Sequence, residues 1–293
     1  LRVIAKNHNV ILFTIDETRP DYVFPHPYFP IHVKQNGDNL RLHIKELKPD
    51  VILHWGDMTR PNGSVGTELG IPQAICFAGG HMEGPSLMHM DHIFVESKVY
   101  LEKFEVMGRS VSTAFGTNTD LFKPKMKPKV FDAFFPATFA DWKRHKPLFA
   151  PAVYGLMACA VGYMYESHED WCWKSCEEAG VLTLPHVSAE ALVHLYGSSH
   201  SVVITSRSDG GSQRSVLEAM AMNIPCIVMA DSDKTSEYIL AANLKPVEPH
   251  PQAIHEEILR VRGTTTNARN YIMQNWSEQH YADAILKGLN QII

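Results

Sequence analysis

In SDGGSQRSVLEAMAMNIPCIVM, residues 208–229, a glycine-rich loop opens onto an apolar helix that ends before a strand-like run, and this order is the strongest indication of the fold. The preceding residues 202–205 are rich in β-branched side chains and predict another strand. Gly210 and Gly211 allow main-chain amides to approach a ligand closely. A helix that begins near Ser215 would direct its positive dipole end at that loop. This combination is typical of an anion site, and equally of a tight turn with a helix cap.

Glu218 is the charged residue inside this helix. Its neighbours between residues 216 and 221 are apolar, so the helix is expected to be mostly buried. A buried carboxylate costs several kcal/mol unless it is paired or bound to a ligand. The pattern leaves both open, an ion pair with Arg214 one turn earlier or a bound ligand. Asn223 is expected to end the helix in a left-handed conformation.

Short β-rich runs alternate with helical stretches along the 293 residues. This alternation predicts an α/β protein with parallel sheets. Several runs are apolar throughout, which is typical of strands covered by helices on both faces. The expected strands lie at residues 10–15, 51–54, 73–77, 92–95, 130–135, 156–164, 202–205 and 226–229.

The segment FKPKMKPKV, residues 122–130, is the expected linker because its prolines and lysines leave no apolar period. It predicts an N-terminal domain over residues 1–127 and a C-terminal domain over residues 128–275. Residues 276–293 predict a terminal helix that packs back on the N-terminal domain. Its expected buried stripe consists of Tyr281, Ile285, Leu289 and Ile292. The first ten residues resemble the tail of a helix running into a strand, so we expect a shortened N-terminal domain.

Composition indicates a soluble globular protein. The net charge of −5, the hydrophobic content of 45% and the mean hydropathy of −0.15 argue against a membrane span and against general binding to polyanions. Five cysteines and the lack of a secretory signal favour the cytoplasm, with peripheral membrane attachment as the alternative. Cys172 and Cys176 are expected to be buried thiols, since no second pair completes a zinc site.

Several segments carry a resemblance to a known family. SVLEAMAMNIPCIVM resembles the C-terminal domain of family-4 retaining glycosyltransferases of the GT-B fold, which often have LEAMA-x-G-x-P-V-I. PHVSAEALVHLYGSSHSVVITS is similar to the segment that precedes it, and FGTNTDLFKP is similar to the hinge pattern G-V-D-x-x-x-F-x-P. KPDVILHWGD and DHIFVESKVYLEKF resemble strands of the N-terminal domain. Together they cover most of residues 48–230.

The resemblance implies two Rossmann-like domains facing across a cleft. It implies transfer of a sugar from a nucleotide-diphosphate donor, with retention of configuration and without a metal or other cofactor. The donor is expected to be a UDP-sugar or a GDP-sugar. A phosphate oxygen of the donor would help to take the acceptor proton, so no protein base is required. The acceptor stays open among saccharide, lipid, protein, small metabolite and modified nucleic-acid base.

The family's donor-binding residues carry over by position. Glu218 would bond the donor ribose, and His186 and Val187 would meet the base. The diphosphate would be lined by Gly210, Gly211, Ser212, Gln213 and Arg214. Lys143 and Arg144 lie in a loop where the family has Arg and Lys, although Thr138 stands at the earlier place. Lys143 is the expected phosphate partner.

The chain departs from the family at one place. Gly210 stands eight residues before Glu218, where the family has its first glutamate, and Asp209 lies one residue earlier. Either Asp209 or the glycine backbone would contact the transferred sugar. His81, in CFAGGHMEG, is expected to touch the same sugar. A metal site of His81 with two nearby histidines is disfavoured by their irregular spacing.

The sequence DSD at residues 231–233 resembles the metal-binding DxD of a different glycosyltransferase fold. Its place after a strand indicates instead a loop near the donor cleft. Two further functions stay open. One is a decayed GT-B-fold nucleotide-binding or scaffold protein, and the other is a nucleotide-sugar epimerase or phosphorylase of the same fold.

Overall fold

The computed structural model describes residues 2–14, 29–32, 37–56, 64–77, 85–125, 127–164, 170–207, 214–232, 238 and 244–293. The chain divides into two compact units. The first comprises Leu1–Phe115 together with Glu278–Ile293, and the second comprises Gly116–Ser277. The division therefore precedes the proline- and lysine-rich residues 122–130. None of the helices within the described ranges is long and apolar enough to cross a membrane.

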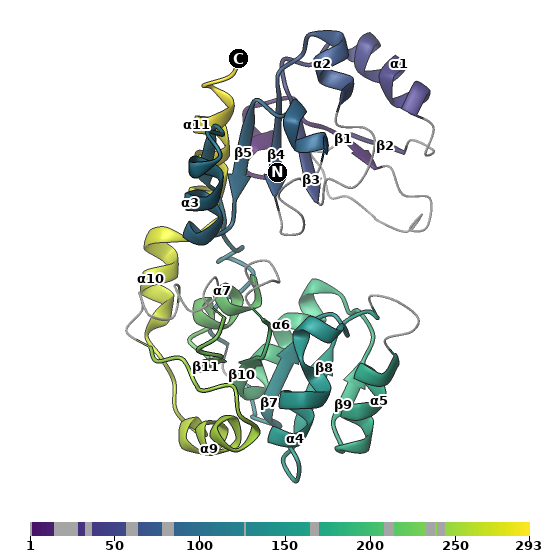
Figure 1. Cartoon of the computed structure of the whole chain (residues 1–293). Coiled ribbons are helices and arrows are strands. Elements are labelled where there is room, and N and C mark those ends of the chain that lie inside the picture. Colours follow the sequence, from purple (N-terminus) through teal and green to yellow (C-terminus); the bar gives the residue numbers. More distant parts are fainter. Residues whose placement is uncertain are drawn as a thin grey trace. The chain divides into compact units, whose positions relative to one another are not determined.

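The first unit contains a parallel sheet of four strands in the order β3-β4-β5-β6. These strands are β3 (Ile52–Gly56), β4 (Gln73–Phe77), β5 (His92–Val95) and β6 (Val111–Thr113). A separate parallel pair joins β1 (Ile11–Thr14) to β2 (Phe29–His32). The α-helices described in this unit are α1 (Gly37–Leu47), α2 (Val65–Leu69), α3 (Lys98–Val106) and α11 (Glu278–Leu289) (Figure 1).

Alternate residues of β4 and β5 face different helices, as the twofold period of a strand requires. Ile75, Phe77, Ile93 and Val95 pack with Tyr100 and Phe104 of α3. Ala74, Cys76 and Phe94 pack on the other face with Ile285 and Leu289 of α11. Gly288 lets α11 approach closely, since a Cβ there would lie 2.4 Å from a ring carbon of Phe94. The expected terminal helix and its buried Ile285 and Leu289 are confirmed.

The second unit contains a parallel sheet of five strands in the order β11-β10-β7-β8-β9. They are β7 (Phe131–Pro136), β8 (Ala158–Val161), β9 (Leu182–Leu184), β10 (Ser199–Ile204) and β11 (Cys226–Val228). From β7 the sheet grows outward through β8 to β9, and β10 then begins on the other side of β7. The direction of growth therefore reverses between β7 and β10. Ligands of open α/β sheets bind at such a reversal, outside the carboxyl ends of the strands.

Helices cover both faces of this sheet, so its central strands are buried along their length. Helices described in this unit include α4 (Ala150–Ala152), α5 (Asp170–Glu178), α6 (Ala189–Gly197), α7 (Arg214–Ala221), α9 (Pro251–Val261) and α10 (Ala268–Asn275), of which α10 packs against α7 (Figure 1). Asn223 follows α7 with φ +57°, which confirms the expected left-handed helix end.

Each strand expected from the sequence is present; β4 and β5 have the expected ends, and the others are shifted at one or both ends. The run expected at residues 202–205 begins at Ser199, and the run expected at residues 156–164 contains strand only at Ala158–Val161. Strands β2, β6 and β9, which have three or four residues each, were not expected from the sequence. Two of them contain serine or threonine, and each is paired to a longer or more apolar neighbour. Such strands are defined by the neighbouring ladder rather than by their own composition.

Candidate functional site

The loops that leave β7 and β10 meet at the reversal point of the second sheet. The loop after β7 forms a short 3₁₀ turn, Asp141–Lys143. After β10 the chain continues through Thr205 to Arg207. The Thr205 hydroxyl donates to the carbonyl of Lys143, and the Arg207 amide donates to the carbonyl of Trp142 at 3.0 Å. The two loops are thus joined by hydrogen bonds at the edge where ligands of this fold class bind.

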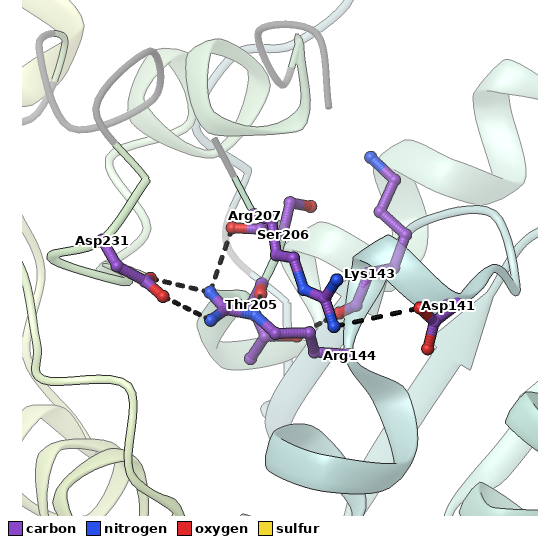
Figure 2. Close-up of polar contacts among 7 residues, drawn as sticks. All are labelled: Asp141, Lys143, Arg144, Thr205, Ser206, Arg207 and Asp231. Atoms are coloured by element: carbon purple, nitrogen blue, oxygen red, sulfur yellow. Dashed lines mark hydrogen bonds and ion pairs between the residues drawn. The ribbon is translucent and has the colours of Figure 1, made fainter. Parts of the chain in front are cut away.

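Arg144 links these two loops to a third (Figure 2). Its guanidinium donates to both carboxylate oxygens of Asp231, at 2.5 and 2.8 Å. It also donates to the carbonyl of Thr205 and, at 3.2 Å, to the carbonyl of Ser206. Asp231 follows β11, so one side chain joins the carboxyl ends of β7, β10 and β11. Arg144, which the resemblance assigned to the donor, is 8% exposed and bound by protein groups.

Three further cations belong to the same edge of the sheet. Lys143 is half-buried in the loop after β7, and Arg214 is exposed at the first residue of α7. The side chain of Arg207 is 49% exposed and lies 3.8 Å from Asp141. Figure 2 shows Lys143 and Arg207 extending from the two joined loops. Arg207 was missed by the sequence analysis, although a cation between a strand and a glycine-rich loop is a readable signal.

Two buried hydroxyls flank the Arg144–Asp231 pair. Ser206 and Ser232 are both fully buried, and neither Oγ atom has a hydrogen-bond partner within the described ranges. An unpaired buried hydroxyl costs about 1–3 kcal/mol. Among the described residues, the edge of the sheet that carries the cations therefore also holds two hydroxyls without a hydrogen-bond partner.

Glu218 lies inside α7 and has a partner that the sequence analysis missed. The Tyr196 hydroxyl donates to Glu218 Oε2 at 2.7 Å. Burial raises the pKa of the Glu218 carboxyl, while the Tyr196 hydroxyl and the positive charge of Arg214 act in the opposite direction. Tyr196 is fully buried and packs edge-to-face against Phe122 and Phe134. Burial and the nearby Glu218 raise its pKa well above the usual value, so the phenol remains the donor.

A cavity of about 530 Å³ lies beyond the carboxyl ends of β8 and β9. His186, expected to meet a nucleotide base, lines it. The cavity is lined by apolar and aromatic side chains and also by charged ones: Tyr163, Met164, Trp173 and Pro185, with Asp170, Lys174 and Glu177. This volume is within the range of small-molecule sites, roughly 300–1,000 Å³. Val187 follows His186 in the chain and is partly exposed.

Part of the expected site lies outside the described residues. This holds for His81 and for the loop residues Asp209, Gly210, Gly211, Ser212 and Gln213. The described part brings Lys143, Arg207 and Arg144 to one edge of the sheet. Cys172 and Cys176, expected to be buried thiols, are both buried in α5, and burial raises the pKa of Cys176 to about 12.

Comparison with known proteins identifies the fold. No protein-family model matches the chain, and no curated protein matches its sequence. A glycosyltransferase from Rickettsia africae has a TM-score of 0.77 at 15% identity, covering 99% of this chain and 93% of that chain. Sucrose-phosphate synthase from Thermosynechococcus elongatus has a TM-score of 0.77 at 16% identity, with 99% and 90% covered.

A third similar structure is Anabaena HepE in complex with UDP and glucose. It has a TM-score of 0.75 at 13% identity, and the match covers 96% of this chain and 99% of that chain. At these identities the likeness concerns the fold. The chain has the α/β fold of the GT-B class, with two Rossmann-like domains, as the sequence analysis expected.

Proposed function

We propose that this protein is a glycosyltransferase that binds a nucleotide-diphosphate sugar at the carboxyl ends of the second sheet. One observation carries the proposal: the reversal point between β7 and β10 gathers Lys143, Arg207 and the amino end of α7. A diphosphate suits this edge because it carries negative charge, which cations and a helix amino end stabilise. The similar structure of HepE in complex with UDP and glucose supports the same ligand class.

The donor would occupy three adjoining parts of the second unit. Its diphosphate would lie against Lys143, Arg207 and the loop 208–213, and its base would enter the cavity at His186. The aromatic and apolar walls of that cavity suit a planar ring. Glu218, held through one carboxylate oxygen by Tyr196, would accept hydrogen bonds from the ribose hydroxyls.

The chemistry then depends on charge stabilisation of the departing nucleotide. Negative charge grows on the leaving diphosphate as the glycosidic bond breaks, and fixed cations that bind it more strongly in the transition state lower the barrier. Lys143 is our candidate for this role. Following the resemblance, we propose a UDP-sugar or a GDP-sugar as donor, retention of configuration and independence from metal ions. From the cysteine content we propose activity in the cytoplasm.

A thermal-shift screen against UDP, GDP, ADP, TDP and their sugars tests the proposal. At a ligand concentration about 100 times Kd, the free energy of unfolding rises by about 2.7 kcal/mol. We expect UDP or GDP to stabilise the chain and Glu218→Ala to remove most of that shift. Exposed Glu190, in α6, provides the control, and Glu190→Ala should retain the shift. The lack of stabilisation by all four nucleotides would contradict the proposal.

Product analysis with the stabilising donor then identifies the reaction. Sugar transferred to an added acceptor supports a glycosyltransferase. A changed sugar on an intact nucleotide, without acceptor, would identify an epimerase instead. Nucleotide binding without turnover across saccharide, lipid and protein acceptors would favour a binding protein on this fold.

A further inference from the structure

The Arg144–Asp231 pair is more than a local ion pair, because it joins loops that are distant in sequence. The two residues are 87 positions apart, and the same guanidinium binds the carbonyls of Thr205 and Ser206. A planar guanidinium fixes direction as well as distance when it binds a carboxylate through two parallel hydrogen bonds. The loops after β7, β10 and β11 are therefore held in one arrangement by one side chain.

The backbone of Arg144 supports this interpretation. Arg144 has φ +57° and ψ +40°, in the left-handed region that costs a non-glycine residue energy. Glycine would adopt the same conformation without that cost. An arginine here thus offsets a backbone penalty by its side-chain contacts. Its positive charge is also matched by Asp231, so the pair carries no net charge toward an anionic ligand.

We propose that Arg144 and Asp231 are a positioning pair for the donor phosphates. This inference rests on the proposed function. Arg144 holds the carbonyls of Thr205 and Ser206, which directly precede Arg207 and the loop 208–213. It also directly follows Lys143 in the chain. The pair thereby sets the direction of both cation-bearing loops without touching the ligand itself.

The same sheet offers a matched control. Arg262, at the end of α9, forms an ion pair with Asp132, whose side chain is 5% exposed. Asp132 also accepts a hydrogen bond from the Met157 amide at 3.0 Å. It lies at the beginning of β7, so this pair lies at the amino end of the sheet. Loss of either carboxylate breaks an arginine ion pair in one unit, but only Asp231 lies at the cation-bearing edge.

The experiment compares UDP binding by calorimetry in the wild-type chain, Asp231→Asn, Asp132→Asn and Arg144→Gly. Simple electrostatics predicts that Asp231→Asn tightens UDP binding, because it removes an anion near a diphosphate. A positioning pair predicts the opposite, about tenfold weaker binding, since small misplacements of binding groups are costly. Asp132→Asn should lower the melting temperature and leave UDP affinity within about twofold of the wild type.

Arg144→Gly keeps the left-handed backbone and removes the guanidinium, so it tests the pair even if Asp231→Asn folds poorly. We expect about tenfold weaker UDP binding here too. Weaker binding in Arg144→Gly with tighter binding in Asp231→Asn would make Arg144 a direct phosphate ligand and overturn the inference. Unchanged affinity in both variants would overturn it as well.

Amide exchange of Arg207 gives a second readout that does not depend on a ligand. Its amide bonds to the Trp142 carbonyl, and we expect faster exchange in Asp231→Asn but not in Asp132→Asn. Unaltered exchange at Arg207 would count against the pair. Failure of the wild-type chain to bind UDP and GDP would overturn the proposed function together with this inference. Normal wild-type binding with unaltered variants would overturn the inference alone.

Discussion

The two ends of the five-stranded sheet use the same interaction for different purposes. At the amino end, Asp132 pairs with Arg262 and fastens the start of β7 to the end of α9. At the carboxyl end, Asp231 pairs with Arg144 and fastens three loops together. Only the carboxyl ends of parallel strands meet helix amino ends, where anions are stabilised. An ion pair therefore contributes to ligand placement according to its end of the sheet.

The largest expected effect on activity is at Lys143, and a lysine at the opposite end of the sheet provides its control. Lys143→Ala, at the carboxyl end, should lower kcat about 100-fold, because in the proposed function Lys143 supplies charge that stabilises the leaving diphosphate. Lys129, before β7, donates to the carbonyls of Gly197 and Ser199 at 3.1 and 2.7 Å. Steady-state kinetics should show near-wild-type kcat for Lys129→Ala. Equal losses in both variants would remove the functional difference between the two ends.

Tyr196→Phe tests the support of Glu218. The phenol donates to a carboxylate, and such bonds contribute about 1.5–3 kcal/mol. We expect denaturant unfolding at pH 7 to show a loss of this size. Without the donor, the pKa of Glu218 rises further, so the difference from the wild type should shrink as pH falls and the carboxylate becomes protonated. A loss independent of pH would indicate packing alone, and the exposed Tyr154→Phe serves as control.

The burial of His145, which follows Lys143 and Arg144 in the chain, predicts that acid lowers the free energy of unfolding. It is fully buried between Phe135 and Phe139, and burial together with Lys143 lowers its pKa to about 3. Below pH 6.5 the unfolded chain binds a proton that the folded chain does not. The free energy of unfolding should thus fall by about 1.4 kcal/mol per pH unit between about pH 6 and pH 3, and be fully retained above pH 6.5.

His145→Phe should remove that contribution while keeping the ring stack. Denaturant unfolding at several pH values measures it as the difference between variant and wild type. At pH 7.5 the difference reports packing only. Parallel curves from pH 7.5 to pH 4 would show that His145 does not titrate in the predicted way.

The smallest expected effect is at Arg207. Its side chain is half exposed, and exposed charges contribute about 1 kcal/mol or less. Arg207→Gln should weaken UDP binding about threefold to fivefold and reduce its dependence on salt, because one phosphate cation is lost. Uridine, which lacks phosphate, should bind equally to both proteins. Equal weakening for uridine would place Arg207 outside the phosphate site.

Much of the fold was predictable because its signals are local. Apolar runs between helical stretches predicted most of the strands that form the two larger sheets, and Asn223 predicted the end of α7. The missed strands are short, and their pairing partners define them. The boundary between units was expected near residues 122–130, and the structure divides the chain at Phe115 and Gly116. Proline and lysine content indicates where a chain lacks helix or strand. The boundary between two hydrophobic cores can lie elsewhere.

The same distinction applies to the candidate site, where residues with a local signal were predictable and contacts between distant residues were not. Glu218 and Lys143 were proposed as site residues from local pattern and resemblance. Both lie in the second unit, Lys143 in the loop after β7 and Glu218 in α7. Their supporting contacts were not predicted. Tyr196 and Glu218 are 22 residues apart, and Arg144 and Asp231 are 87 apart. Such partners are brought together by strand order, which composition and spacing do not specify.

The return of α11 to the first unit has a consequence for synthesis. This helix covers one face of the first sheet, through Ile285 and Leu289, yet it lies at residues 278–289. During translation that face stays uncovered until the entire second unit has left the ribosome. The second unit is a continuous stretch and can complete its core earlier. The first unit is therefore synthesised first but completes its core last. Its apolar face stays open to chaperone binding until α11 packs on it.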